Sequence, residues 1–198
     1  MKIRKYLWEI ANIIKGNDQI VIKPTTRCNL KCSYCAANFV HGRPSKFTEV
    51  TVDDWILMID KRKPSAVTLS GGEPAVYEEL PELINRLVAK GYLITIFSNI
   101  SDIRPFMKIP KTWRVKFYST YHPNFSLQKY KFNLKILSNR FYVDIREVRA
   151  IDDPSPKYIK ESKTKVLMVE QNKAYAEMYA PNLSLFHSCY DMDNNEEN

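Results

Sequence analysis

The stretch TRCNLKCSYC, residues 26–35, holds three of the four cysteines of this 198-residue chain. Cys28, Cys32 and Cys35 follow the spacing C-x3-C-x2-C. A disulfide would use two of these thiols and leave the third, and a structural zinc site needs four ligands, usually in separated pairs. An electron-transfer iron–sulfur cubane also takes four thiolates. Three local thiolates instead favour a cluster with one iron left open to a ligand that is not protein, as a catalytic zinc site keeps one position open.

A second informative stretch lies downstream, at SGGEP, residues 70–74. Two adjacent glycines let the backbone approach a ligand closely, although such a stretch on its own also fits an ordinary strand-to-helix turn. The cysteine triplet, with Tyr34 just before its last member, and the following Gly-Gly-Glu-Pro together resemble the two signature motifs of the radical S-adenosylmethionine (SAM) superfamily. The resemblance extends from about Ile20 to Glu170, and these two stretches carry its specific part.

The resemblance implies a cofactor pair. Cys28, Cys32 and Cys35 would bind three irons of a [4Fe-4S] cluster, and SAM would chelate the fourth. An electron from the reduced cluster would then cleave SAM to a 5′-deoxyadenosyl radical, which takes hydrogen from a substrate. The cofactors perform the chemistry, and the protein orients them and excludes water. The same resemblance implies further contacts with SAM. Its amino group would be bound by the motif Gly71, Gly72, Glu73 and Pro74, and its adenine would pack near Tyr34.

Apolar periodicity and turn residues predict alternating strands and helices around these motifs. Alternation at this pace implies parallel βαβ units with right-handed crossovers. Six strands are too few to close an eight-stranded barrel, so we expect an α/β fold, an open partial barrel in one domain spanning residues 1–198. The expected strands are 19–23, 66–69, 92–97, 113–118, 141–148 and 164–169. The expected helices are 5–14, 51–63, 78–90, 102–108, 126–139 and 173–179, with a frayed polar tail at 188–198.

The carboxyl ends of parallel strands share one edge of the sheet, where the active sites of such folds lie. This rule brings together the cysteine loop, 71–74, 98–99 and 119–122. By the resemblance, Ser98, Asn99 and Ser119 match positions that bond the ribose hydroxyls or the carboxylate of SAM. The alternative for each is capping of a strand-end turn.

Tyr121 and His122, which follow the fourth strand, are candidates to face a substrate, and a packed loop position is the alternative for each. Charged residues alternate along the fifth strand at Arg146, Glu147 and Arg149. A charge on the inner side could hold a substrate or the SAM carboxylate. Many members of the family carry a glycine near the adenine here, whereas residues 141–150 contain none.

Two other metal sites fit the cysteines. His41 could complete a Cys3His zinc site with the triplet, but this leaves the Gly-Gly-Glu-Pro stretch unexplained. Cys189 could be the fourth ligand of an electron-transfer cluster, or a free thiol.

The composition favours a cytoplasmic protein that does not enter a membrane. No apolar run approaches the roughly 20 residues of a membrane span, and Glu9, Asn12 and Lys15 interrupt the first apolar stretch, unlike a secretion signal. Clustered cysteines agree with a reducing compartment. The net charge of +8 is spread over the chain. It suits an anionic partner, either a nucleic acid, a phosphorylated substrate or an acidic electron donor of the flavodoxin or ferredoxin type.

The sequence therefore predicts a radical SAM enzyme that acts on a small molecule, a nucleotide or a nucleic-acid base. Two alternatives stay open. One is an activase that places a glycyl radical on a partner enzyme, and the other is a non-catalytic iron–sulfur or zinc-binding module.

Overall fold

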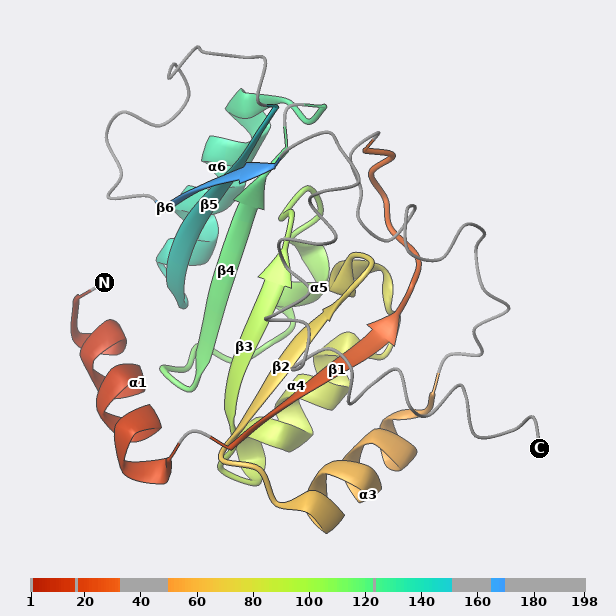
Figure 1. Ribbon diagram of the computed structural model, residues 1–198, viewed down its shortest axis with the longest axis vertical. Helices are drawn as coiled ribbons and strands as arrows, with labels where there is room; N and C mark the ends of the chain where they lie inside the picture. Colours follow the sequence, from red (N-terminus) through yellow and green to blue (C-terminus); the bar gives the residue numbers. More distant parts are fainter. Residues whose placement is uncertain (1, 17, 33–49, 123, 151–164, 170–198) are drawn as a thin grey trace.

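The computed structural model describes residues 2–16, 18–32, 50–122, 124–150 and 165–169 (Figure 1). Six strands of this described part form one sheet, and all neighbouring strands are parallel. The spatial order equals the chain order, so each connection moves one strand along the sheet. The strands are β1 (Gln19–Thr25), β2 (Ala66–Gly71), β3 (Leu93–Ser98), β4 (Val115–Tyr121), β5 (Tyr142–Ala150) and β6 (Lys165–Val169). The predicted α/β partial barrel is confirmed.

Helices alternate with the strands along the chain. They are α1 (Lys2–Lys15), α3 (Val52–Arg62), the 3-10 turn η1 (Pro74–Val76), α4 (Leu80–Ala89), α5 (Arg104–Met107) and α6 (Leu127–Ser138). Two of the expected helix starts are capped by side chains. Thr51 accepts the backbone N–H of Asp54 at 3.3 Å and donates to its carboxylate at 2.7 Å, and Ser126 accepts the N–H of Lys129 at 3.4 Å. These bonds satisfy backbone N–H groups that have no partner within the helix.

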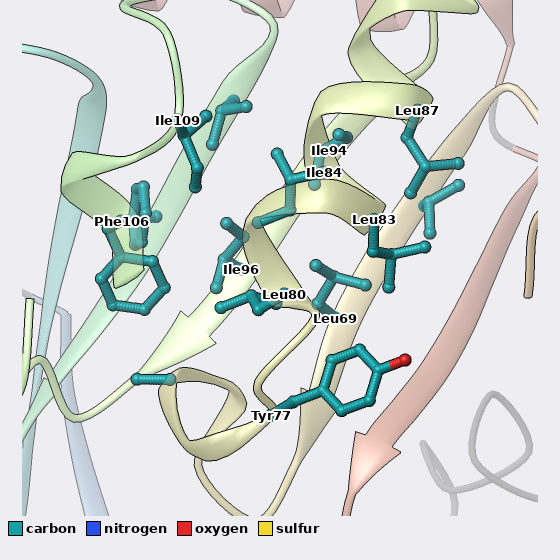
Figure 2. Packing of buried hydrophobic residues seen from close by; sticks show 14 of the residues in the cluster. Leu69, Tyr77, Leu80, Leu83, Ile84, Leu87, Ile94, Ile96, Phe106 and Ile109 are labelled. Atoms are coloured by element: carbon teal, nitrogen blue, oxygen red, sulfur yellow. The ribbon is translucent and has the colours of Figure 1, made fainter. Parts of the chain in front are cut away.

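One face of the sheet carries the main apolar core. Helix α4 presents Leu80, Leu83, Ile84 and Leu87, at the spacing of a single helical stripe, to side chains of β2 and β3 (Figure 2). These leucines and isoleucines are completely buried, as are Leu69, Ile94 and Ile96 beneath them. Further along, Phe106 of α5 and Phe117 of β4 meet edge to face, with their ring centroids 4.9 Å apart. This packing fixes the strands whose ends form the site.

The opposite face, which we call the inner face, is closed at its amino end by α1. Trp8 of α1 is 8% exposed and packs with Ala66, Leu93 and Tyr142, which lie at or near the starts of three strands. The helix is present as predicted, but its widest apolar stripe faces away from the sheet. Six large side chains of α1 are 43–77% exposed: Ile3, Tyr6, Leu7, Ile10, Ile13 and Ile14. No helix in the described ranges is long and apolar enough to cross a membrane.

Most differences from the predicted elements lie at their ends. Strands β1, β2, β4 and β5 run two or three residues further toward the carboxyl edge than their apolar patterns indicate. The expected helix at 173–179 and the polar tail at 188–198 lie outside the described residues.

Candidate active site

The carboxyl ends of β1, β2, β3 and β4 meet at one edge of the sheet, as predicted. Hydrogen bonds join their loops directly. The N–H of Gly72 donates to the carbonyl of Thr25 at 3.0 Å, and that of Glu73 donates to the carbonyl of Arg27 at 2.8 Å. The start of the cysteine loop is therefore held by the Gly-Gly-Glu stretch that follows β2.

The two glycines are needed for this close approach. Gly71 has a φ of +112°, which side chains rarely adopt, and a Cβ there would lie 2.5 Å from the carbonyl oxygen of Thr25. A Cβ on Gly72 would lie 2.0 Å from the carbonyl oxygen of Arg27. The sequence predicted a close approach of this backbone to a ligand. In the structure the groups that the missing Cβ atoms would meet belong to the end of β1 for Gly71 and to the start of the cysteine loop for Gly72.

The side chain of Glu73 ties the end of β2 to the end of β3. Its carboxylate is 2% exposed and accepts the Ser98 hydroxyl at 2.7 Å, the Asn99 N–H at 2.8 Å and the Ala75 N–H at 3.1 Å. Burial raises the pKa of Glu73 from 4.5 to about 7, and the three hydrogen bonds oppose that rise. Ser98 is also an acceptor for the N–H of Ile100, a residue with a left-handed φ of 49°.

Cys28 and Cys32 lie in this mouth, next to side chains from β3 and β4. Cys28 is exposed, and its sulfur accepts the N–H of Leu30 at 3.4 Å and the amide of Asn99 at 3.9 Å. Cys32 is buried, and its sulfur contacts Nδ2 of Asn124 at 3.4 Å, Oδ1 of the same amide at 3.6 Å and Nδ1 of His122 at 3.6 Å. Burial lowers the pKa of His122 to about 4, so this imidazole is neutral at pH 7.

The inner face below the mouth carries two cations set among aromatic rings. The guanidinium of Arg146 lies 3.9 Å from the ring centroid of Tyr118 and 5.1 Å from that of Phe97. Lys116 is buried; its ammonium donates to the Tyr118 hydroxyl at 2.7 Å and lies 3.9 Å from the carboxylate of Asp144. No carboxylate of the described residues forms an ion pair with Arg146. Its guanidinium is therefore suited to an anionic ligand.

Comparison with known proteins identifies the family. The family model of the radical SAM superfamily matches residues 22–153. This range is more than half of the chain and includes both motifs. The chain belongs to the radical SAM superfamily. The family's cofactors are a [4Fe-4S] cluster and SAM.

The relatives of this radical SAM chain have several activities. It is 30% identical over 79 residues to the S-adenosylmethionine-dependent nucleotide dehydratase of Selenomonas ruminantium, covering 38% of this chain and 27% of that protein. It is 24% identical over 212 residues to the 7-carboxy-7-deazaguanine synthase of Aquifex aeolicus, covering 93% of this chain and 92% of that protein. The chain spans only 27–33% of the length of the first curated relatives, which are 30% identical to it or more over the matched residues.

A solved structure confirms the fold. Streptococcus suis SuiB, bound to the precursor peptide SuiA, superposes with a TM-score of 0.57 at 17% sequence identity. The match covers 99% of this chain and 50% of that one.

The residues in the mouth fit the radical SAM cofactors. Thiolates are the usual ligands of iron–sulfur clusters, and N–H groups lie beside the sulfurs of Cys28 and Cys32. The third predicted ligand, Cys35, lies outside the described residues, as do Tyr34, His41 and Cys189. Within the described ranges there is no group of three metal-ligating side chains.

The other predicted site residues divide between the mouth and the core. Gly71, Gly72, Glu73, Pro74, Ser98, Asn99 and His122 lie at or next to the mouth. Ser119 is fully buried, and its hydroxyl lies 2.8 Å from the hydroxyl of Tyr130 in α6. Tyr121 packs its ring against the same tyrosine, with the centroids 5.1 Å apart. These contacts place Ser119 and Tyr121 on the helix side of β4, so a cofactor or substrate role for them stays a prediction.

Sequence reasoning missed Asn124, Lys116 and the aromatic pair Phe97 and Tyr118. The signal for Lys116 was available, because a lysine between Val115 and Phe117 must point to the other face of the strand from these core residues. The same alternation places Arg146 on the inner face, which settles the side on which this charge of β5 lies.

Proposed function

We propose that this chain is a radical SAM enzyme that holds its cluster through Cys28, Cys32 and Cys35 and acts on a small anionic substrate of the nucleotide class. The observation that carries the first part is the direct joining of the cysteine loop to the Gly-Gly-Glu stretch, through the Gly72 and Glu73 N–H groups. When bound, the cluster and SAM supply a 5′-deoxyadenosyl radical that takes hydrogen from a substrate.

The chain's own residues position these cofactors. Cys28 and Cys32 would bind irons, with Cys35 as the third ligand, and the backbone from Gly71 to Pro74 would face the amino group of SAM. The carboxylate of Glu73 accepts hydrogen bonds from residues at the ends of both β2 and β3. These bonds keep Asn99 beside the cysteine loop. Helix α1 covers the amino end of the inner face, which limits the access of water from that side.

The inner face supports an anionic substrate. Arg146 presents a planar cation that can pair with a phosphate or carboxylate in a bidentate manner, beside rings that a base can stack upon. The names of two relatives, a nucleotide dehydratase and a 7-carboxy-7-deazaguanine synthase, refer to compounds that combine an aromatic base with an anionic group. We therefore assign the substrate's anionic group to Arg146 and its planar group to the neighbourhood of Phe97 and Tyr118.

The reaction also needs an electron donor. The net charge of +8 suits docking of an acidic protein of the flavodoxin or ferredoxin type.

The first test is anaerobic. The chain is reconstituted with iron and sulfide, given SAM and a strong reductant, and assayed for 5′-deoxyadenosine by mass spectrometry. We expect the product from the natural sequence and none from the variant with alanine at Cys28, Cys32 and Cys35. A full cluster with bound SAM but no product would support a binding role or a strict need for substrate. Stoichiometric zinc without a cluster would support a metal module, and stable capture of a glycyl-radical protein would support the activase.

The second test addresses the substrate class. Equilibrium dialysis compares the four ribonucleoside triphosphates with their nucleosides. If Arg146 holds the anionic group, at least one triphosphate binds more tightly than its nucleoside, and Arg146→Gln weakens its binding about 10-fold to 100-fold. The matched control is Arg104→Gln, because the side chain of Arg104 is 87% exposed and pairs with Asp102. Equal binding of every nucleotide and its nucleoside would contradict the assignment.

A further inference from the structure

The sulfur atoms of Cys28 and Cys32 each face nitrogen donors from another strand end. Nδ2 of Asn124, which follows β4, lies 3.4 Å from the sulfur of Cys32, and Oδ1 of the same amide lies 3.6 Å from it. Nδ2 of Asn99, which follows β3, lies 3.9 Å from the sulfur of Cys28. The two asparagines are remote from the cysteines in sequence, by 92 and 71 positions, so the fold itself brings each amide to its sulfur.

The surroundings of Asn99 fix which atom of its amide faces the sulfur. Its backbone N–H donates to Glu73 at 2.8 Å, and its side-chain oxygen accepts the N–H of Ser101 at 2.8 Å. With the oxygen occupied in this way, the amide nitrogen points to the cysteine loop, where it donates to Asn29 at 3.0 Å and to Cys28. Asn99 is 6% exposed, and the bond from Ser101 to its oxygen holds the amide in this orientation.

Amide donors at a thiolate have a defined electrostatic effect. A reduced cluster carries one more electron than an oxidised cluster, and part of that charge resides on the ligand sulfurs. An N–H group that points at a sulfur therefore stabilises the reduced state more than the oxidised state and raises the reduction potential.

We infer that Asn124 and Asn99 tune the reduction potential of the cluster by donating to the sulfurs of Cys32 and Cys28. The inference rests on the proposed function in one respect, because it takes these cysteines as cluster ligands. Neither asparagine is a catalytic residue in this scheme: both act through the cysteines, and the electron still comes from the donor protein.

The test measures the potential of the reconstituted full chain without SAM or substrate. Anaerobic redox titration, followed by the electron paramagnetic resonance signal of the reduced cluster, gives the midpoint. We expect Asn124→Ala and Asn99→Ala to lower the midpoint. Asn124→Asp should lower it further than Asn124→Ala, because a carboxylate of the same shape cannot donate when ionised and adds negative charge. The control is Gln128→Ala, which removes an exposed amide from α6 and should leave the midpoint unchanged.

The iron content is measured on each preparation, so that a damaged cluster is not taken for a tuned one. Unchanged midpoints in both Asn124 variants at full iron content overturn the inference, even if the natural sequence forms 5′-deoxyadenosine. A shift of the same size in Gln128→Ala also overturns it. If Asn124→Ala holds no cluster, Asn124→Asp and Asn99→Ala still decide the sign. A natural chain that takes up no cluster overturns the proposed function together with this inference.

Discussion

Replacement of Gly72 by alanine tests whether the two motifs form one structural unit. Gly72 does not have a positive φ, so its backbone conformation permits alanine. The obstacle is space alone. The new Cβ would lie 2.0 Å from the carbonyl oxygen of Arg27, and contacts shorter than 3.0 Å are essentially never seen. The cysteine loop and the β2 turn must separate by about 1 Å at this point.

The separation has a cost that follows from the contacts at the junction. It stretches the bonds from the Gly72 N–H to Thr25 and from the Glu73 N–H to Arg27, which are 3.0 Å and 2.8 Å long. At about 1 kcal/mol for each bond, we expect the free energy of unfolding to fall by roughly 2 kcal/mol. Cys28 directly follows Arg27, so the displacement also moves a proposed cluster ligand, and most of the iron should be lost on reconstitution.

The assay combines urea unfolding of the iron-free chain with iron content after reconstitution. The control is Gly91→Ala, because Gly91 has a φ of +85° but open space at its Cβ position. That variant should lose about 1 kcal/mol through backbone strain and keep its iron. If Gly72→Ala retains full iron and its unfolding free energy changes by less than about 0.5 kcal/mol, the two motifs are not joined as described.

Three further changes test the remaining contacts. The pKa of Glu73 is raised to about 7, so its carboxyl contributes stability that is fully present below about pH 4.5 and is lost as the pH rises through 7. Glu73→Gln should abolish this pH dependence, which is worth roughly 3 kcal/mol in the free energy of unfolding. Urea unfolding at pH 5 and pH 8 measures it. The same pH dependence in the natural chain and the variant would count against the buried carboxyl. Tyr130→Phe leaves the buried hydroxyl of Ser119 without this partner and should cost about 1 kcal/mol in unfolding free energy, with no change in SAM binding by equilibrium dialysis; weakened SAM binding would instead favour the cofactor role of Ser119. Cys32→Ala should lose the iron and the visible absorption of the cluster, whereas Cys189→Ala should keep both; iron loss in the second variant would indicate a four-thiolate cluster.

The order and type of the elements could be predicted from the sequence because their signals are local. The capping pair at Thr51 and Asp54 and the apolar stripe from Leu80 to Leu87 each mark an element without reference to the rest of the fold. The parallel arrangement then placed both motifs at one edge. In α1 the local signal gave the helix but not the side that packs, because Trp8 and its partners on three strands decide the orientation.

The partners of the site residues could not be predicted, because they depend on distances between distant parts of the chain. Sequence spacing marks Gly72 as a point of close approach but does not show that the group it meets is Arg27. Ser119 and Ser98 look alike as short polar residues near strand ends. The structure separates them, because one faces Tyr130 under α6 and the other faces Glu73 in the mouth.

The long-range brace of the cysteine loop has a consequence for synthesis of the protein. Cys32 leaves the ribosome 92 residues before Asn124, its contact after β4. At about 5 to 20 residues per second, roughly 5 to 18 s pass in which the thiol has no such neighbour. During that interval the cysteines are open to oxidation and to stray metal ions. Under the proposed function, the complete surroundings of Cys32 are available to a cluster only after β4 has been made.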